Sequence, residues 1–253
     1  MPRRPPLYRA RTIGRRLVLL PRRDRAVPEL RAPTTNRILS SLSSADFALL
    51  EPHLAPVNLP LRKVLEGRNK RIEHVYFVEH GFASVVANGD GKRGIEVGII
   101  GREGMTGLSV IFGRDRARHE TFIQVAGNGQ RISVPNLRSA IRESSDLLAQ
   151  LLLYADTFLM QASETALANG RSNIEQRLAR WLLMADDRLD GELPLTQEFL
   201  SIMLGVRRAG VSAAVQELER QGLIVAKRGG IQVVDREALE ECAGETYTAL
   251  DHD

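Results

Sequence analysis

A set of side chains that can bind phosphates and nucleobases lies between residues 196 and 228 of the 253-residue chain. The candidate contact residues are Thr196, Arg207, Arg208, Ser212, Ala213, Gln216, Lys227 and Arg228. Guanidinium and ammonium groups bind phosphate, and one arginine can donate two hydrogen bonds to the O6 and N7 atoms of guanine. We therefore expect contact with double-stranded DNA, with Arg208 on a base edge and the other cations and Ser212 on phosphates. The alternative for Arg207 is a solvated surface charge.

Two short helices and a tight turn must position these residues. Thr196 can cap the first helix, which has Leu200 and Leu204 on one face. Gly205 lies where the turn needs a residue that tolerates positive φ. The second helix has apolar residues at helical spacing, namely Val206, Val211, Ala214, Val215 and Leu218. Packing of these residues inward turns the polar face toward solvent or a DNA groove.

A hairpin with a basic tip is predicted after the second helix. Two β-rich runs, residues 223–226 and 231–234, flank the sequence Lys227-Arg228-Gly229-Gly230. The major groove is about 12 Å wide and admits one helix, while a cationic hairpin can lie against the neighbouring phosphates. Helix-turn-helix units also occur in protein-interaction modules, so a sensor or scaffold that contacts another protein is the alternative interpretation.

The stretch from Thr196 to Ile224 resembles the Crp/Fnr family of bacterial transcription regulators. Residues 75–86 resemble the family's central strand, glycine turn and return strand, and residues 101–104 stand where the family carries its effector-pocket loop. The resemblance covers most of residues 36–240. It implies an α+β fold with an N-terminal antiparallel β-roll of the jelly-roll, cyclic-nucleotide-binding-like type, a long dimerisation helix and a C-terminal winged helix-turn-helix.

Five segments are expected along the chain. They are a disordered basic tail at 1–33, a β-roll sensor domain at 34–143, a dimerisation helix at 144–170, a winged helix-turn-helix domain at 171–240 and a C-terminal tail at 241–253. A short helical lead-in is predicted over residues 36–54, with Ser43, Ser44 and Asp46 available as caps. Short β-rich runs within the roll are predicted at 75–78, 83–87, 95–100, 122–125 and 131–134.

The overall charge is weak evidence for nucleic-acid binding. The sequence pI is 9.6. Residues 1–33 contain ten arginines and two acidic residues, while the whole chain has a net charge of only +4. The folded remainder is therefore about −4. The tail is expected to be solvated, the alternatives being a cationic arm that touches DNA or a start codon assigned too far upstream. The local cluster of basic residues carries the electrostatic argument instead.

A homodimer is predicted from the long helix. Its apolar residues recur at alternating spacings of four and three, a heptad pattern formed by Leu148, Leu152, Ala155, Leu159, Ala162 and Ala166. A second apolar line, Leu147, Leu151, Tyr154 and Phe158, runs beside it. One line can pack on the roll while the other meets the same helix of a second copy. The alternative is a single buried helix with a broad apolar face.

The candidate effector pocket contains Gly101, Glu103 and Gly104. In cyclic-nucleotide-binding relatives a Gly-Glu-x-Gly loop supplies a carboxylate to the ribose, but here Arg102 stands in the place of that glutamate. No Arg-Ser or Arg-Ala pair follows clearly in register, so we expect no response to cAMP. An unknown small-molecule effector remains a predicted partner, and RNA polymerase is a further candidate.

No cofactor or metal is expected. The single cysteine, Cys242, excludes an intrachain disulfide and an all-cysteine iron–sulfur or zinc site. A cupin-like metal enzyme is a less favoured alternative, because the five histidines include no close His-x-His pair. We expect a regulator that is not an enzyme. No apolar run reaches the roughly 20 residues that span a bilayer, and the apolar run at 17–20 is too short for an export signal. The expected location is the cytoplasm.

Overall fold

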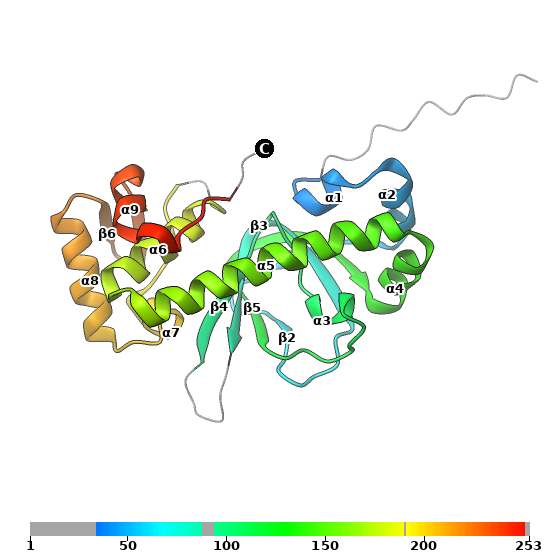
Figure 1. The fold of residues 1–253 in the computed structure, drawn as a ribbon, viewed down its shortest axis with the longest axis horizontal. Coiled ribbons are helices and arrows are strands. Elements are labelled where there is room, and N and C mark those ends of the chain that lie inside the picture. The colour runs from blue at the N-terminus through cyan, green and yellow to red at the C-terminus, as the bar shows by residue number, and fades with distance from the viewer. Residues whose placement is uncertain (1–33, 88–93, 190, 251–253) are drawn as a thin grey trace, which may run out of the picture. The chain divides into compact units, whose positions relative to one another are not determined.

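The computed structural model describes residues 34–87, 94–189 and 191–250. The predicted basic tail and the Asn-Gly-Asp-Gly turn at 88–91 lie outside the described residues. The chain begins with short helices, continues with most of the strands and ends in a mainly helical part (Figure 1). The N-terminal elements are α1 (Arg37–Ser41), α2 (Ser44–Leu50), the 3-10 helix η1 (Glu51–His53), β1 (Ala55–Leu59), β2 (Val64–Glu66), β3 (His74–Ala87), β4 (Ile95–Ile100), α3 (Leu108–Ile111), β5 (Glu120–Ser133) and α4 (Val134–Glu143).

The C-terminal elements begin with the long helix. They are α5 (Ser145–Arg171), α6 (Ile174–Asp186), α7 (Gln197–Met203), α8 (Arg208–Arg220), β6 (Ile224–Lys227), β7 (Gly230–Val233), α9 (Arg236–Ala243) and the 3-10 helix η2 (Gly244–Thr246). The predicted lead-in helices are confirmed, because Asn36 caps α1 and Ser43 caps α2. Among the described helices, none combines the length and apolar character that crossing a membrane requires.

The roll is an antiparallel sheet with strand order β1-β5-β3-β4, in which β2 also pairs with β5. The predicted return strand after Gly81 is wrong. Residues 74–87 form one strand, β3, that pairs with β5 from His74 opposite Ser133 to Val86 opposite Glu120. The pairing shifts register around Gly81, whose φ is +72° and whose Cα faces the β5 backbone too closely for a Cβ. Gly81 therefore bends a continuous strand and does not reverse the chain.

The long helix α5 lies along the roll and leads into the C-terminal elements (Figure 1). Ser144 caps it by accepting a hydrogen bond from the Leu147 amide, and Asp146 lies in its first turn. The helix ends at Arg171, and Asn173 opens α6 with a capping box that includes Gln176. The chain therefore leaves the helix at Ser172, which separates α5 from α6.

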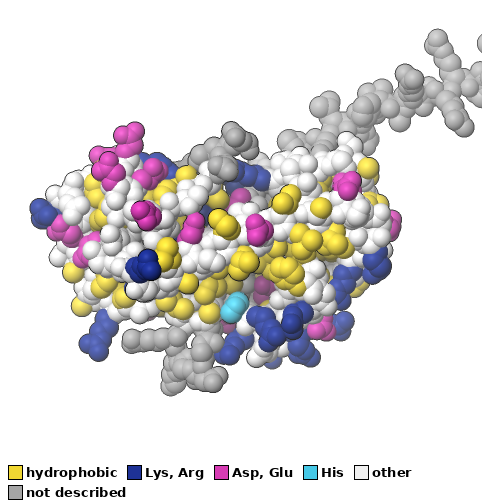
Figure 2. Space-filling view, viewed as in Figure 1, with side chains coloured by type: hydrophobic (Ala, Val, Ile, Leu, Met, Phe, Trp, Pro, Cys, Tyr) yellow, Lys and Arg dark blue, Asp and Glu magenta, His cyan; other side chains and the backbone are white. Residues whose placement is uncertain are grey.

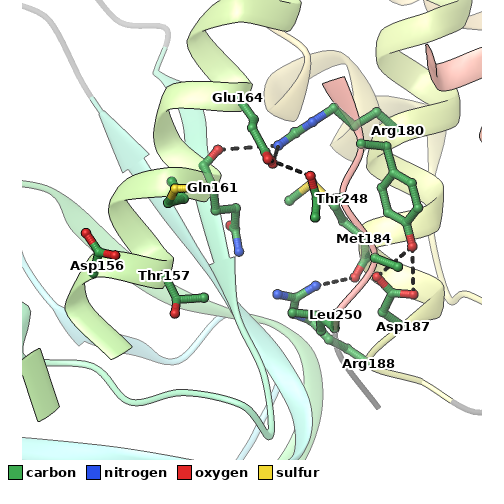
Figure 3. Close-up of a pocket in the computed structure, with 13 residues that line it drawn as sticks. Asp156, Thr157, Gln161, Glu164, Arg180, Met184, Asp187, Arg188, Thr248 and Leu250 are labelled. Carbon is green, nitrogen blue, oxygen red and sulfur yellow. Dashed lines mark hydrogen bonds and ion pairs between the residues drawn. The ribbon is translucent and has the colours of Figure 1, made fainter. Parts of the chain in front are cut away.

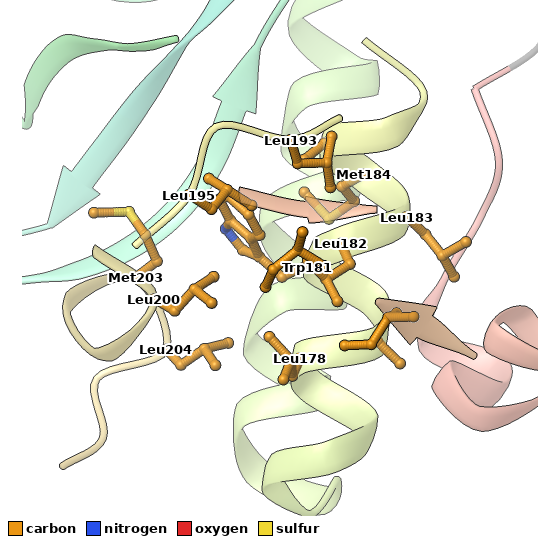
Figure 4. Packing of buried hydrophobic residues seen from close by; sticks show 14 of the residues in the cluster. Leu178, Trp181, Leu182, Leu183, Met184, Leu193, Leu195, Leu200, Met203 and Leu204 are labelled. Carbon is orange, nitrogen blue, oxygen red and sulfur yellow. The ribbon is translucent and has the colours of Figure 1, made fainter. Parts of the chain in front are cut away.

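Two large apolar clusters hold these elements together. One joins α1, α2, α4 and the first half of α5 to residues of β3 and β5 of the roll. The other is centred on Leu178, Trp181 and Leu182 of α6 and includes Leu200 and Leu204 (Figure 4). This second cluster extends into the roll through Phe82, whose ring meets Trp181 edge-on at 6.3 Å between centroids. The roll and the C-terminal elements thus share a continuous core within residues 34–250.

The mixed helix and antiparallel-sheet fold expected from the sequence is confirmed. Two expected segment limits fall inside observed helices. The limit at 170 lies inside α5, which continues to Arg171, and residue 240 lies inside α9, which continues to Ala243 and is followed by η2. Leu239 and Ala243 are both buried in the core around Trp181. The first part of the predicted C-terminal tail is therefore packed structure.

Candidate nucleic-acid interface

The first helix of the pair, α7, is built as the sequence predicts. The Thr196 hydroxyl accepts a hydrogen bond from the Phe199 amide at 3.3 Å and caps the helix. Leu200 and Leu204 are buried against α6 and α8. Gly205 has φ +62° and makes the turn into α8. This turn fixes where the next helix begins.

The second helix, α8, separates an apolar face from a polar one. Val211, Ala214, Val215 and Leu218 are buried. The exposed face of α8 carries Arg207, Arg208, Ala213 and Gln216. Five of the predicted contact residues lie on α8 or its cap, and four of them are exposed. The fifth, Ser212, is half-buried, because its hydroxyl donates to Gln197 Oε1 at 2.7 Å.

The charge distribution at the start of α8 is unfavourable for an isolated helix. The N-terminus of a helix carries partial positive charge and favours acidic residues by about 0.3–1 kcal/mol each. The first turn of α8 has no acidic residue, and its N-cap, Arg207, makes no side-chain cap hydrogen bond. Arg207 and Arg208 are both exposed there. Two cations at the positive end of a helix form a ready binding position for an anion.

The predicted basic hairpin is present with its strands displaced by about one residue. Strands β6 and β7 pair with Lys227 opposite Gly230, and Gly229 has φ +87° at the turn. Lys227 Nζ lies 3.6 Å from Glu192 Oε2, and both side chains are about half exposed. An exposed pair of this kind contributes about 0–1 kcal/mol, so Lys227 can exchange it for a phosphate. Arg228 is exposed at the tip.

A groove of about 610 Å³ lies between α7, α8 and the hairpin. We call it the hairpin groove. It brings together three of the predicted contact residues, Thr196, Arg208 and Lys227. Two residues of the roll, Leu61 and Arg62, also line it, and they were not among the predicted contacts. No sequence signal pointed to these two, because they lie more than 130 residues before the helix pair.

The predicted effector loop is already occupied by another part of the same chain. Glu103 Oε1 accepts from the Gly101 amide at 3.0 Å and from Arg188 Nε and Nη2 at 2.9 and 2.7 Å. The side chains of Arg188 and Glu103 are only 1% and 9% exposed. Gly104 packs against the Tyr154 ring of α5 so closely that a Cβ would overlap it. The loop therefore binds the end of α6, and Arg188 is a residue that sequence reasoning missed.

A second buried carboxyl group joins the roll to α6. Glu96 of β4 is almost fully buried and accepts a hydrogen bond from Trp181 Nε1. Burial raises the pKa of Glu96 to about 7, although hydrogen bonds from Ser84 and Trp181 oppose the shift. Its second oxygen, Oε2, has no hydrogen-bond partner among the described residues. Trp181 is thus a core residue whose N–H is also paired across the contact between the roll and α6.

A pocket of about 300 Å³ lies between α5, α6 and residues 247–250 (Figure 3). Four of its charged residues, Glu164, Arg180, Asp187 and Arg188, are paired within the chain. Arg180 Nη2 lies 3.5 Å from Glu164 Oε2, and the Thr248 hydroxyl donates to Glu164 Oε1 at 2.7 Å. Asp187 is bound by Arg236 and by the Tyr247 hydroxyl. These contacts attach the C-terminal segment to α5 and α6.

The residues predicted to form the dimer interface differ in how far their side chains are exposed. Leu152 and Leu159 are exposed, whereas Leu148 and Ala162 are half-buried and Ala155 is buried within its own chain. Ala166 is exposed, and Ala155 lines a surface groove together with Leu152, Leu159 and Ala162, so the predicted seam stays a prediction. The second apolar line faces inward as expected, since Leu147, Leu151 and Tyr154 are buried.

An exposed apolar surface on α5 differs in part from the predicted seam. Hydrophobic side chains gather along the course of α5 on the face shown in Figure 2. The exposed ones, which we call the α5 patch, are Leu152 at 42%, Leu153 at 62%, Leu159 at 62%, Met160 at 58% and Leu167 at 41%. A groove of about 500 Å³ lined by Leu152, Leu159 and Phe112 adjoins this patch. Within the described ranges, no group of three or more His, Cys, Asp or Glu side chains is arranged to hold a metal ion.

Comparisons with known proteins agree with this architecture. Residues 176–242 match the family model of the Crp-like helix-turn-helix domain. FixK2 from Bradyrhizobium japonicum is similar in structure, with a TM-score of 0.65, 20% identity, and coverage of 78% of this chain and 98% of that one. A CRP-family transcriptional regulator from Thermus thermophilus has a TM-score of 0.64 and 18% identity, with coverage of 77% and 100%. No curated protein matches the sequence.

A third solved structure, a Crp/Fnr-family regulator from Eubacterium rectale, has a TM-score of 0.64 and 17% identity, and it covers 83% of this chain and 98% of its own. At these identities the solved structures establish the fold, and the family model identifies the C-terminal domain. Residues 176–242 form a Crp-like helix-turn-helix domain, and the described chain has the fold of the Crp/Fnr transcription regulators.

Proposed function

We propose that the chain is a transcription regulator that binds a two-fold symmetric DNA site as a homodimer, with α8 in the major groove of each half-site. The observation that carries this proposal is the pair of exposed arginines, Arg207 and Arg208, at the positive end of α8. A helix that presents cations there gains most from a polyanionic partner. The match of residues 176–242 to the Crp-like domain supports the same function.

We assign the predicted contact residues to different parts of the DNA. We assign Arg208 to a base edge and Arg207, Lys227, Arg228 and Thr196 to phosphates. Ala213 and Gln216 lie on the exposed face of α8 and are assigned to the groove floor. Ser212 holds α8 against α7 through Gln197, and we assign it a positioning role in place of the phosphate contact expected from the sequence. The best-known Crp/Fnr members carry an Arg-Glu dipeptide on this face, whereas this chain has Arg207-Arg208 followed by alanine and glycine, so the operator should differ from theirs.

Dimerisation is assigned to α5. The α5 patch is apolar over more than four helical turns, between Leu152 and Leu167, and a second copy of the same helix can cover it in a parallel pair. Two-fold pairing places two recognition helices on successive major grooves, about 34–36 Å apart. A dimer with two-fold symmetry therefore predicts a DNA site with the same symmetry.

Regulation is assigned to the contact between the roll and α6. Glu103 with Arg188 and Glu96 with Trp181 connect the loop and β4 of the roll to the helix that begins the DNA-binding domain. An unidentified effector or partner that favours one arrangement of these parts would shift the population able to bind DNA. Because the Glu103 carboxylate already binds Arg188, we infer that cAMP is not this effector. RNA polymerase remains a candidate partner, and contact with another protein in place of DNA is the second candidate function.

Fluorescence anisotropy with labelled duplexes at several salt concentrations tests the proposal. Arg208→Ala should reduce the preference for the selected site by about 1–3 kcal/mol and leave binding to other duplexes nearly unchanged. Lys227→Ala should weaken binding to all duplexes alike and reduce the slope of log affinity against log salt by about 0.9 for each lost contact, or about two for the dimer. Equal loss of specific and non-specific affinity in Arg208→Ala would contradict the base contact. A wild-type protein that binds no duplex at low salt would favour the protein-contact function.

A further inference from the structure

The hairpin groove has one wall made by the roll. Leu61 and Arg62 line it together with Arg208 of α8 and Lys227 of the hairpin. Both roll residues are exposed, and they belong to the turn between β1 and β2. The surface assigned to DNA therefore does not end at the helix-turn-helix domain but continues onto the roll.

The backbone at Arg62 is held in an uncommon conformation. Its φ is +65°, a left-handed value that non-glycine residues rarely adopt. The Arg62 amide donates to the Ile123 carbonyl at 2.8 Å, which ties the turn to β5. The guanidinium carbon lies 5.7 Å from the centroid of the Phe199 ring of α7. The turn thus directs the Arg62 side chain across the gap between the roll and α7.

The charges around the groove favour an anion. Arg62, Arg208 and Lys227 contribute three cations to its lining, and Glu198 contributes one carboxylate. Arg62 makes no ion pair within residues 34–87, 94–189 and 191–250, and its contact with Phe199 is a cation–π interaction. Such a contact at an exposed site contributes about 0.5–1 kcal/mol and leaves the guanidinium N–H groups able to donate to an anion.

We propose that Arg62 binds a DNA phosphate, so that the sensor roll contributes directly to DNA affinity. This inference rests on the proposed function, since it names a further contact for the same DNA. The phosphate is the one that lies over the hairpin groove, between the contacts of Arg208 and Lys227. Arginine suits this position because its planar fork can donate two parallel hydrogen bonds to phosphate oxygens.

The inference has a regulatory consequence. Arg62 reaches the groove only while the roll is docked on α6 and α7, and that docking depends on the buried pairs Glu103 with Arg188 and Glu96 with Trp181. A signal that moves the roll would then remove one phosphate contact from each half of the dimer. DNA binding would in return stabilise the docked roll, because coupling between two sites is reciprocal.

Salt-dependent anisotropy on the full chain tests the role of Arg62. Arg62→Asn removes the charge, and asparagine tolerates the left-handed backbone. The matched control is Lys63→Ala, which removes the same charge one residue away. Lys63 Nζ donates to the Asn58 carbonyl at 3.2 Å and lies 5.6 Å from the Tyr76 ring centroid, so it is directed along the roll. Arg62→Lys keeps the charge and serves as the second variant.

Arg62→Asn should weaken binding to every duplex by about tenfold. It should also reduce the slope of log affinity against log salt by about 0.9 for each lost contact, or about two for a dimer. Lys63→Ala and Arg62→Lys should keep the wild-type slope. The inference is overturned if Arg62→Asn behaves like Lys63→Ala, or if it tightens binding, since the turn would then cover the groove. Absence of binding by the wild type would instead remove the proposed function together with this inference.

Discussion

Replacing Asp156 with asparagine should strengthen the homodimer. Asp156 is exposed on α5 and lies three or four residues from Leu152, Leu153, Leu159 and Met160. Residues at these spacings are neighbours on a helix surface, so the carboxylate lies in the middle of the α5 patch. In a parallel symmetric pair each residue at the seam meets its own copy. Dimerisation would therefore bring two carboxylates together and remove them from water.

The size of the effect follows from Coulomb's law. Two unit charges about 8 Å apart at an effective dielectric constant of about 20 repel by roughly 2 kcal/mol. Asparagine has nearly the same shape and no charge, so Asp156→Asn should lower the dimer dissociation constant by about 10- to 30-fold. The gain should shrink as salt is added, because ions screen charges near the surface.

Sedimentation analysis over a range of protein concentrations measures this change directly. Glu237→Gln is a matched control, because it removes an exposed carboxylate from α9, outside the long helix. An unchanged or weaker dimer in Asp156→Asn, with thermal stability equal to the wild type, would refute the assignment of this face to a second copy. An equal gain in dimer affinity in both variants would show that the gain comes from net charge alone.

Three further predictions concern the contact between the roll and α6. Glu103→Gln should lower the free energy of unfolding in urea by about 3–5 kcal/mol, because Arg188 is left buried without a counter-ion. The double variant Glu103→Gln with Arg188→Met should recover most of that loss, and additive losses would contradict the pairing. Burial raises the folded-state pKa of Glu96 from 4.5 to about 7, so the free energy of unfolding should fall as pH rises through this interval, by at most about 3 kcal/mol from this group. Glu96→Gln should remove that part of the pH dependence. An identical pH profile in the variant would count against the buried carboxyl. Calorimetric titration with cAMP should show no binding, and sub-millimolar affinity would overturn the inference from Glu103.

Local patterns predict the helix pair well, because the cap of α7 and the apolar spacing of both helices depend on residues that are close together in the sequence. Thr196, Gly205 and the buried side of α8 each depend on residues within one or two helical turns. The prediction fails at Gly81 because a glycine between two β-rich runs fits a hairpin turn and a bend in one strand equally well. Only the pairing of β3 with all of β5 distinguishes the two.

The parts that sequence could not reveal depend on contacts between distant segments. Arg188 lies 85 residues after Glu103, and neither residue type nor spacing indicates that they pair. Arg62 lines the hairpin groove because its side chain contacts Phe199 of α7, and these two residues are also far apart in the sequence. The heptad pattern on α5 could not separate the side that packs on the roll from the side that is exposed, since both are apolar. Burial in the structure separates the two sides, because Leu147, Leu151 and Tyr154 are buried while Leu152 and Leu159 are exposed.

Selection of bound duplexes from a random pool by the purified protein tests the central claim most directly. The account predicts enrichment of a two-fold symmetric sequence whose half-site centres are about one helical turn of DNA apart, and loss of the preference at one position of each half-site in Arg208→Ala. Recovery of no preferred sequence by the wild type, at moderate salt and with or without cell extract to supply an activator, would contradict it.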